Sequence, residues 1–129
     1  MKEIAQIRVY IDQTYEIKGG HLEVHMILFH GEAQGDYFTG EILPGAVDTQ
    51  KYGADEALLS ARYMIEGEDN TGKPCHVFIE NNGVDGKLTP QIITDSEALH
   101  WLETKHLQAT LEVTEKYVLI TILCEGGQL

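Results

Sequence analysis

The chain has 129 residues, of which 43% are hydrophobic and 23% charged, a composition typical of one folded domain and not of a disordered segment. Nine Lys and Arg residues stand against 21 Asp and Glu residues, and the formal net charge of −12 argues against nucleic-acid backbones and anionic lipid surfaces as partners. No apolar stretch approaches the roughly 18 residues that span a bilayer. We expect no signal peptide, and the two cysteines favour a reducing cytoplasm over a disulfide-framed scaffold.

Polar and apolar residues alternate with a period of two along most of the chain, which predicts β-strands. Turn-forming residues separate these strands, among them Gly19-Gly20, Pro44-Gly45 and the segment 68–74. The expected strands lie near residues 6–12, 21–30, 36–43, 56–67, 75–82, 91–94, 107–113 and 117–123. Residues 83–90 predict a loop, and Asp48 is expected in the loop that follows Pro44-Gly45. Short strands at such intervals indicate a sandwich or a barrel.

Residues 95–103 depart from this pattern and predict a short helix. Asp95 or Ser96 can cap its first amide groups, and Leu99 and Trp101 belong to an apolar cluster at helical spacing. We therefore expect about two helical turns that dock on the body of the protein through one face. In that position Trp101 packs in the core or offers an aromatic surface to a ligand.

The hairpin around Thr71 permits a prediction of strand register. If its strands pair symmetrically about Thr71, the numbers of facing residues add up to 142. One face then carries the apolar pairs Tyr63–Ile79 and Ile65–Val77, and the other face carries Arg62–Glu80, Met64–Phe78 and Glu66–His76. The Arg62–Glu80 pair is either an exposed pair contributing about 0–1 kcal/mol, or part of a barrel lining where a buried charge marks a site. The sequence leaves both alternatives open.

Several kinds of chemistry find little support in the motifs. His21 and His25 are spaced for a metal site on a helix, but on a strand four residues span about 13 Å, so we expect no metal site. A nucleophilic serine is not expected either, because Ser60 falls within a strand, Ser96 caps a helix and no G-x-S-x-G motif is present. No glycine cluster precedes a helix in the manner of a phosphate loop. We expect no cofactor.

The remaining candidates are acidic, basic and aromatic side chains near the ends of predicted strands. Those that we assign to ligand binding are Asp48, Arg62, Glu66, His76, Glu80 and Trp101. Asp48 has a second interpretation, because an aspartate after a turn commonly bonds to the backbone of its own loop.

The order of these motifs resembles a bacterial family known as domain of unknown function 3237. The resemblance extends over roughly residues 20–124 and rests on GEAQGDYFTGEILPGAVD, SARYMIEGEDNTG, CHVFIENNG and HWLETKHLQATLEV. Asp48 and Arg62 fall at motif positions of the family, whereas Thr49 stands where the family usually has tryptophan. The resemblance implies a closed or nearly closed antiparallel β-barrel of the calycin or lipocalin type, with eight to ten strands, that self-associates and has no settled activity.

Two hypotheses of function follow. In the first, the barrel binds a small organic molecule, Arg62 orients an anionic or carbonyl group, and Asp48, Glu80 or His76 transfers a proton as in an isomerase or lyase. Arg62 and a carboxylate can equally hold the barrel together. In the second hypothesis, the protein is a non-catalytic module that pairs barrels into homodimers through apolar outer faces.

Overall fold

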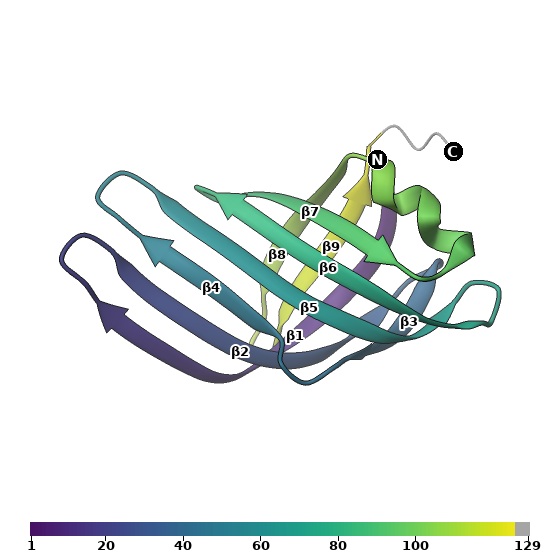
Figure 1. Cartoon of the computed structure of the whole chain (residues 1–129), viewed down its shortest axis with the longest axis horizontal. Coiled ribbons are helices and arrows are strands. Elements are labelled where there is room, and N and C mark those ends of the chain that lie inside the picture. The colour runs from purple at the N-terminus through teal and green to yellow at the C-terminus, as the bar shows by residue number, and fades with distance from the viewer. Residues whose placement is uncertain (126–129) are drawn as a thin grey trace.

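The computed structural model describes residues 1–125 and consists almost entirely of antiparallel β-structure (Figure 1). Its elements are β1 (Lys2–Lys18), β2 (Glu23–Gln34), β3 (Phe38–Ile42), β4 (Val47–Tyr52), β5 (Ala57–Asp69), β6 (Pro74–Val84), β7 (Lys87–Thr94), the 3₁₀-helix η1 (Glu97–Thr104), β8 (Leu107–Val113) and β9 (Val118–Cys124). The predicted mainly-β fold with a short helix near residues 95–103 is confirmed. Within the described residues, no helix has the length and apolarity that crossing a membrane requires.

All nine strands belong to one strongly curved sheet. The hydrogen-bonded order is β7-β6-β5-β3-β2-β1-β9-β8, and β4 follows β3 in the same place between β2 and β5. The curvature brings β7 close to β8, but no ladder joins these two strands in the described chain. The chain passes from β7 to β8 through η1, which buries Leu99 and Leu102 in the core at that end of the barrel-like sheet.

The interior follows from the alternation seen in the sequence. β7 alternates between exposed and buried residues along its whole length, and β6 does so along most of its length. The fully buried side chains gather toward the end covered by η1, and the largest are Ile4, Ile7, Phe38, Ile65, Ile79, Ile92, Leu99, Leu102 and Ile122. This apolar cluster closes one end of the barrel.

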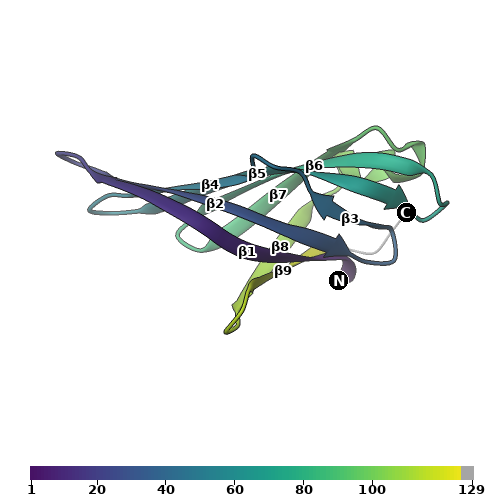
Figure 2. The same ribbon diagram turned by 90° about the horizontal axis from the view of Figure 1, so that it is seen from below.

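The opposite end is extended into an arm made of two hairpins, β1–β2 around residues 11–28 and β4–β5 around residues 47–60. Figure 1 shows both hairpins reaching away from η1, and Figure 2 shows them tapering side by side beyond the rest of the sheet. Residues 11–20 are exposed throughout, so this end of the sheet has solvent access to both of its faces.

Two sequence predictions of local structure need correction. The segment after Pro44-Gly45 is not a loop but β4, which pairs with β2 on one side and β5 on the other. Residues 83–90 are not a loop either: β6 and β7 extend into this segment and meet at a two-residue turn. Asp85 and Gly86 adopt positive φ angles of 50° and 87°, as a tight hairpin turn of this type requires.

The predicted side-chain cap of the helix is also wrong. Ser96 has the extended backbone of a capping residue, but its hydroxyl donates to Asp69 at 2.7 Å, and Asp95 accepts from the backbone N–H of His76 at 2.8 Å. Asp69 also accepts from the hydroxyl of Thr71, and these bonds hold its pKa well below the usual range. The side chain of Asp95 therefore connects the start of η1 to β6, and the side chain of Ser96 connects it to the β5–β6 turn.

Candidate functional site

The register predicted for the β5–β6 hairpin is confirmed in full, with Arg62 facing Glu80 and Glu66 facing His76. The apolar partners of the predicted pairs point into the core, where Tyr63, Ile65, Val77 and Ile79 are at most 3% exposed. The mixed face therefore points outward, and the alternative that it lines the barrel interior is wrong. Burying four large side chains on one face forces their neighbours in sequence to the other.

Arg62 consequently lies outside the barrel. Its side chain is 64% exposed, and its Nε lies 3.4 Å from Glu80 Oε2. Asp48 faces Ala61 across the β4–β5 ladder and points inward, whereas Val47 faces Arg62 and points outward. The two residues that match family motifs thus lie on opposite faces of the sheet and cannot hold one ligand together.

Trp101 is separated from the other candidates. It sits half-buried on η1 and packs edge-on against Tyr37, with ring centroids 5.4 Å apart. It packs against the apolar core from η1, and Figure 1 shows this helix at the end of the sheet opposite the arm. This geometry supports the core interpretation of the side chain.

His76 forms a bridge between two carboxylates on the outer face. Its Nε2 lies 3.0 Å from Glu66 Oε2 and its Nδ1 lies 3.2 Å from Asp95 Oδ2. The hydrogen bond with Glu66 and, to a smaller extent, the one with Asp95 raise the pKa of His76 above the ordinary value of 6.5, because both carboxylates favour the imidazolium. Both ring nitrogens are engaged, so His76 serves as a connection between β5, β6 and the start of η1.

This arrangement predicts a pH dependence of stability. A histidine whose pKa is raised on folding stabilises the native state fully below its unfolded pKa, and this contribution is lost as the pH rises through the folded pKa. His76→Gln should therefore lower the thermal midpoint most at pH values below about 6.5, and the difference from wild type should shrink above the folded pKa. Melting curves by circular dichroism between pH 5.5 and pH 9 measure this difference. A gap that is constant over this range would assign the histidine a packing role only.

Three buried polar atoms on the inner face lack hydrogen-bond partners. Asp48 Oδ1, the hydroxyl of Tyr63 and Asn81 Oδ1 are all buried, and none has a hydrogen-bond partner among the described residues. Tyr63 is 3% and Asn81 2% exposed. Native proteins leave few such groups unpaired, since each costs roughly 1–3 kcal/mol.

These groups come from three adjacent strands. Asp48 on β4 faces Ala61 on β5, and Ala61 faces Asn81 on β6, so the three form one row across the inner face. Two strand spacings place the Cα atoms of Asp48 and Asn81 about 10 Å apart. Ala61 lies between them with only a methyl group, and Tyr63 is the next inward residue of β5. The row therefore has polar side chains at its two ends and a small side chain, that of Ala61, in the middle.

Asp48 is held in place from the arm side. Gln50 Nε2 donates to Asp48 Oδ2 at 2.8 Å, and the hydroxyl of Tyr52 donates in turn to Gln50 Oε1. Burial raises the pKa of Asp48, and the bond from Gln50 only partly opposes this. The ring of His25 lies 5.1 Å from that of Tyr52, so polar side chains follow one another along the inner face of the arm, from His25 and Tyr52 to Asp48.

The sequence contained a signal for the two residues that were missed. Tyr63 and Asn81 share the inward parity of the apolar positions 65, 77 and 79. The predicted register assigns Tyr63 to the apolar set, although a buried tyrosine hydroxyl usually has a hydrogen-bond partner. Continuing the same alternation by one step would have placed the amide of Asn81 inside the barrel.

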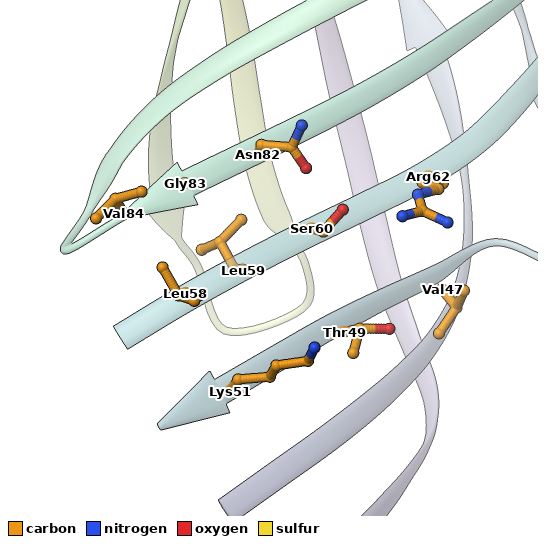
Figure 3. A pocket seen from close by; sticks show the side chains of 10 residues that line it. All are labelled: Val47, Thr49, Lys51, Leu58, Leu59, Ser60, Arg62, Asn82, Gly83 and Val84. Carbon is orange, nitrogen blue, oxygen red and sulfur yellow. The ribbon is translucent and has the colours of Figure 1, made fainter. Parts of the chain in front are cut away.

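A depression of about 440 Å³ lies on the other face of the same strands (Figure 3). Arg62 and Lys51 stand at its two ends on neighbouring strands, and Ser60 lies between them. Ser60 Oγ is buried and has no hydrogen-bond partner in residues 1–125. In this part of the chain no group of three or more His, Cys, Asp or Glu side chains is arranged to hold a metal ion.

Solved structures with the same fold come from several organisms. A protein of unknown function from Clostridium acetobutylicum superposes with a TM-score of 0.80 at 23% identity, over 95% of this chain and 94% of that one. A beta-barrel like protein from Acinetobacter baumannii gives 0.78 at 18% identity, over 95% and 93%. An enzyme from Penicillium herquei gives 0.74 at 15% identity, over 95% and 92%. At these identities the likeness establishes the fold alone.

The sequence comparisons agree with the family resemblance. A UPF0311 protein from Clostridium acetobutylicum is 38% identical over 58 residues, which are 44% of this chain and 34% of that relative. The match thus spans about a third of the length of the relative. Residues 1–89, more than half of this chain, match the family model described as "Protein of unknown function (DUF3237)". The chain therefore belongs to the DUF3237 family.

Proposed function

We propose that the protein binds a small organic molecule on the inner face of the barrel, over Ala61 and between Asp48 and Asn81. The observation that carries this proposal is the set of three buried, unpartnered polar atoms on Asp48, Tyr63 and Asn81. A ligand that supplied their missing hydrogen bonds would remove the cost of burying them. No side chain or backbone group of the described residues supplies these hydrogen bonds.

The lining selects the kind of ligand. Asp48 Oδ1 and Asn81 Oδ1 accept hydrogen bonds, whereas the hydroxyl of Tyr63 can donate one, and burial raises its pKa so that it keeps its proton. Neither Lys nor Arg occurs at the inward positions of residues 48–52, 57–63 and 77–83. The site thus suits a neutral molecule with hydrogen-bond donors at two ends and a carbonyl between them, and not an anion.

Proton transfer is the reaction that this lining would support. Asp48 can remove a proton from a bound molecule and return it at another atom, which is the step common to isomerases and many lyases. Tyr63 would donate to the carbonyl oxygen as negative charge develops there. The raised pKa of Asp48 favours the exchange, because burial brings its acidity closer to that of a carbonyl compound's labile proton.

A titration with 4-hydroxybenzamide tests the proposed site. This neutral probe carries a donor at each end and a carbonyl beside one of them. We expect its addition to shift the ¹H–¹⁵N resonances of residues around Ala61, and Asn81→Leu or Asp48→Asn to weaken binding at least 5-fold. Thr49→Val is the matched control, because Thr49 neighbours Asp48 but points to the outer face. Equal binding by 4-hydroxybenzoate, or shifts that avoid the inner face, would contradict the proposal.

A further inference from the structure

We infer that the outer depression in Figure 3 is a second binding site and that it takes a small amphipathic carboxylate. It is separate from the inner site, because the side chains of Arg62, Ser60 and Lys51 lie on the opposite face of the strands from Asp48. A ligand can therefore bind at one site whether or not the other site is occupied.

The charges of the depression differ from those of the whole protein. The chain carries 21 acidic and only nine basic Lys and Arg residues. The outward positions are 47, 49 and 51 on β4, 58, 60 and 62 on β5, and 80, 82 and 84 on β6. They hold two cations, Arg62 and Lys51, and a single carboxylate, Glu80. This small area is therefore a place where an anion can approach a protein that otherwise repels it.

Arg62 has the capacity to bind a carboxylate. Its Nε lies 3.4 Å from Glu80 Oε2, while the side chain as a whole remains 64% exposed. The terminal N–H groups of a guanidinium form a planar fork that matches the two oxygens of a carboxylate. Figure 3 shows these nitrogens directed over the space between β5 and β4.

The body of the ligand would lie on an apolar strip. Val47 lies beside Arg62, and Leu58 and Val84 face each other at the far end of the depression. Four residues of strand separate Arg62 from Leu58, which is about 13 Å. Val84 is 52% exposed, so a hydrocarbon chain of six to eight carbons along this strip would remove apolar surface from water.

Ser60 supplies an independent observation. Its hydroxyl is buried in the middle of the depression and lacks a hydrogen-bond partner among the described residues. A polar ligand atom there, or a carboxylate seated between Ser60 and Arg62, would complete its hydrogen bonding. Lys51, at the other end, forms no ion pair within residues 1–125 and can attract a second anionic group.

The test compares two probes of equal length and opposite charge, sodium octanoate and octylammonium chloride. We expect octanoate to shift the ¹H–¹⁵N resonances of β4, β5 and β6 around Ser60, with an affinity at least 5-fold above that of octylammonium. Arg62→Gln should weaken octanoate binding at least 5-fold, and Lys51→Gln by a smaller factor. Arg8→Gln is the matched control, because Arg8 is an exposed arginine on the outer face of a different part of the sheet.

Three results would overturn the inference. Octylammonium could bind as well as octanoate, or Arg62→Gln could leave octanoate binding unchanged. Alternatively, sedimentation velocity could show a dimer that Leu58→Asp dissociates, in which case a second copy of the chain covers the depression. Tyr63→Phe, which alters only the inner face, should leave octanoate binding unaffected. The proposals for the inner and the outer site can therefore be tested independently.

Discussion

Replacement of Gly67 by alanine is expected to prevent folding, whereas the same change at Gly20 is expected to leave stability within about 0.5 kcal/mol of wild type. Gly67 faces Gly40 across the β3–β5 ladder. A Cβ atom at Gly67 would lie 1.8 Å from the carbonyl oxygen of Thr39 and 2.5 Å from the Cα of Gly40. Both are backbone atoms that cannot move aside without breaking the ladder, so we expect a loss beyond roughly 4 kcal/mol.

The measurement is a urea titration followed by circular dichroism. Gly67→Ala should appear as insoluble or unfolded protein, and Gly20→Ala should unfold at the wild-type midpoint because nothing lies within 4 Å of a Cβ at Gly20. Cooperative unfolding of Gly67→Ala near the wild-type midpoint would show that β3 and β5 can move apart to admit the Cβ atom. The close approach of Gly67 to Gly40 would then not be required for folding.

Alternation predicted the walls of the barrel wherever one face is uniformly apolar. The β5–β6 hairpin is the best case: Tyr63, Ile65, Val77 and Ile79 demand one register, because a shift by one residue would expose them all. The structure adopts that register. Local sequence and the packed core therefore specify the same arrangement, and the prediction needs no information from elsewhere in the chain.

Prediction failed at β4 for a physical reason. Its inward residues Asp48 and Gln50 are polar, so the sequence VDTQKY shows no apolar alternation and resembles a loop. β4 is a strand because β2 and β5 on either side complete its ladders, and this backbone pairing does not require an apolar face on β4 itself. The same polarity that conceals the strand supplies the inner candidate site.

Of two polar residues in the β5–β6 hairpin, the sequence patterns singled out Arg62 and not Asn81. Arg62 attracted attention as a charge opposite Glu80, but its exposure follows once the apolar face is assigned to the core. Asn81 attracted none, since one polar residue after Val77 and Ile79 looks like the end of a strand. Whether a polar residue is buried without a hydrogen-bond partner depends on the folded structure and not on the local sequence.

Removal of the Tyr63 hydroxyl is expected to stabilise the protein in the absence of ligand, by about 1–2 kcal/mol. Conversion of a buried tyrosine to phenylalanine usually destabilises a protein, because the hydrogen bond of the hydroxyl is lost. Here the hydroxyl is buried and has no partner among residues 1–125, while the ring packs edge-on against Phe29 at 5.5 Å. Phenylalanine keeps the ring contact and removes only the unpaired group.

The sign of this change in the free energy of unfolding shows whether the Tyr63 hydroxyl has a partner in the folded protein. Urea unfolding of Tyr63→Phe, with Tyr52→Phe as the control, measures it. Tyr52 is 39% exposed and donates to Gln50, so its conversion should be neutral or slightly destabilising. A destabilised Tyr63→Phe would mean that the hydroxyl bonds within the folded protein, and the argument for a ligand there would lose one of its three groups. A stabilised variant that also binds 4-hydroxybenzamide more weakly would show that the inner face gives up folding free energy in exchange for a binding function.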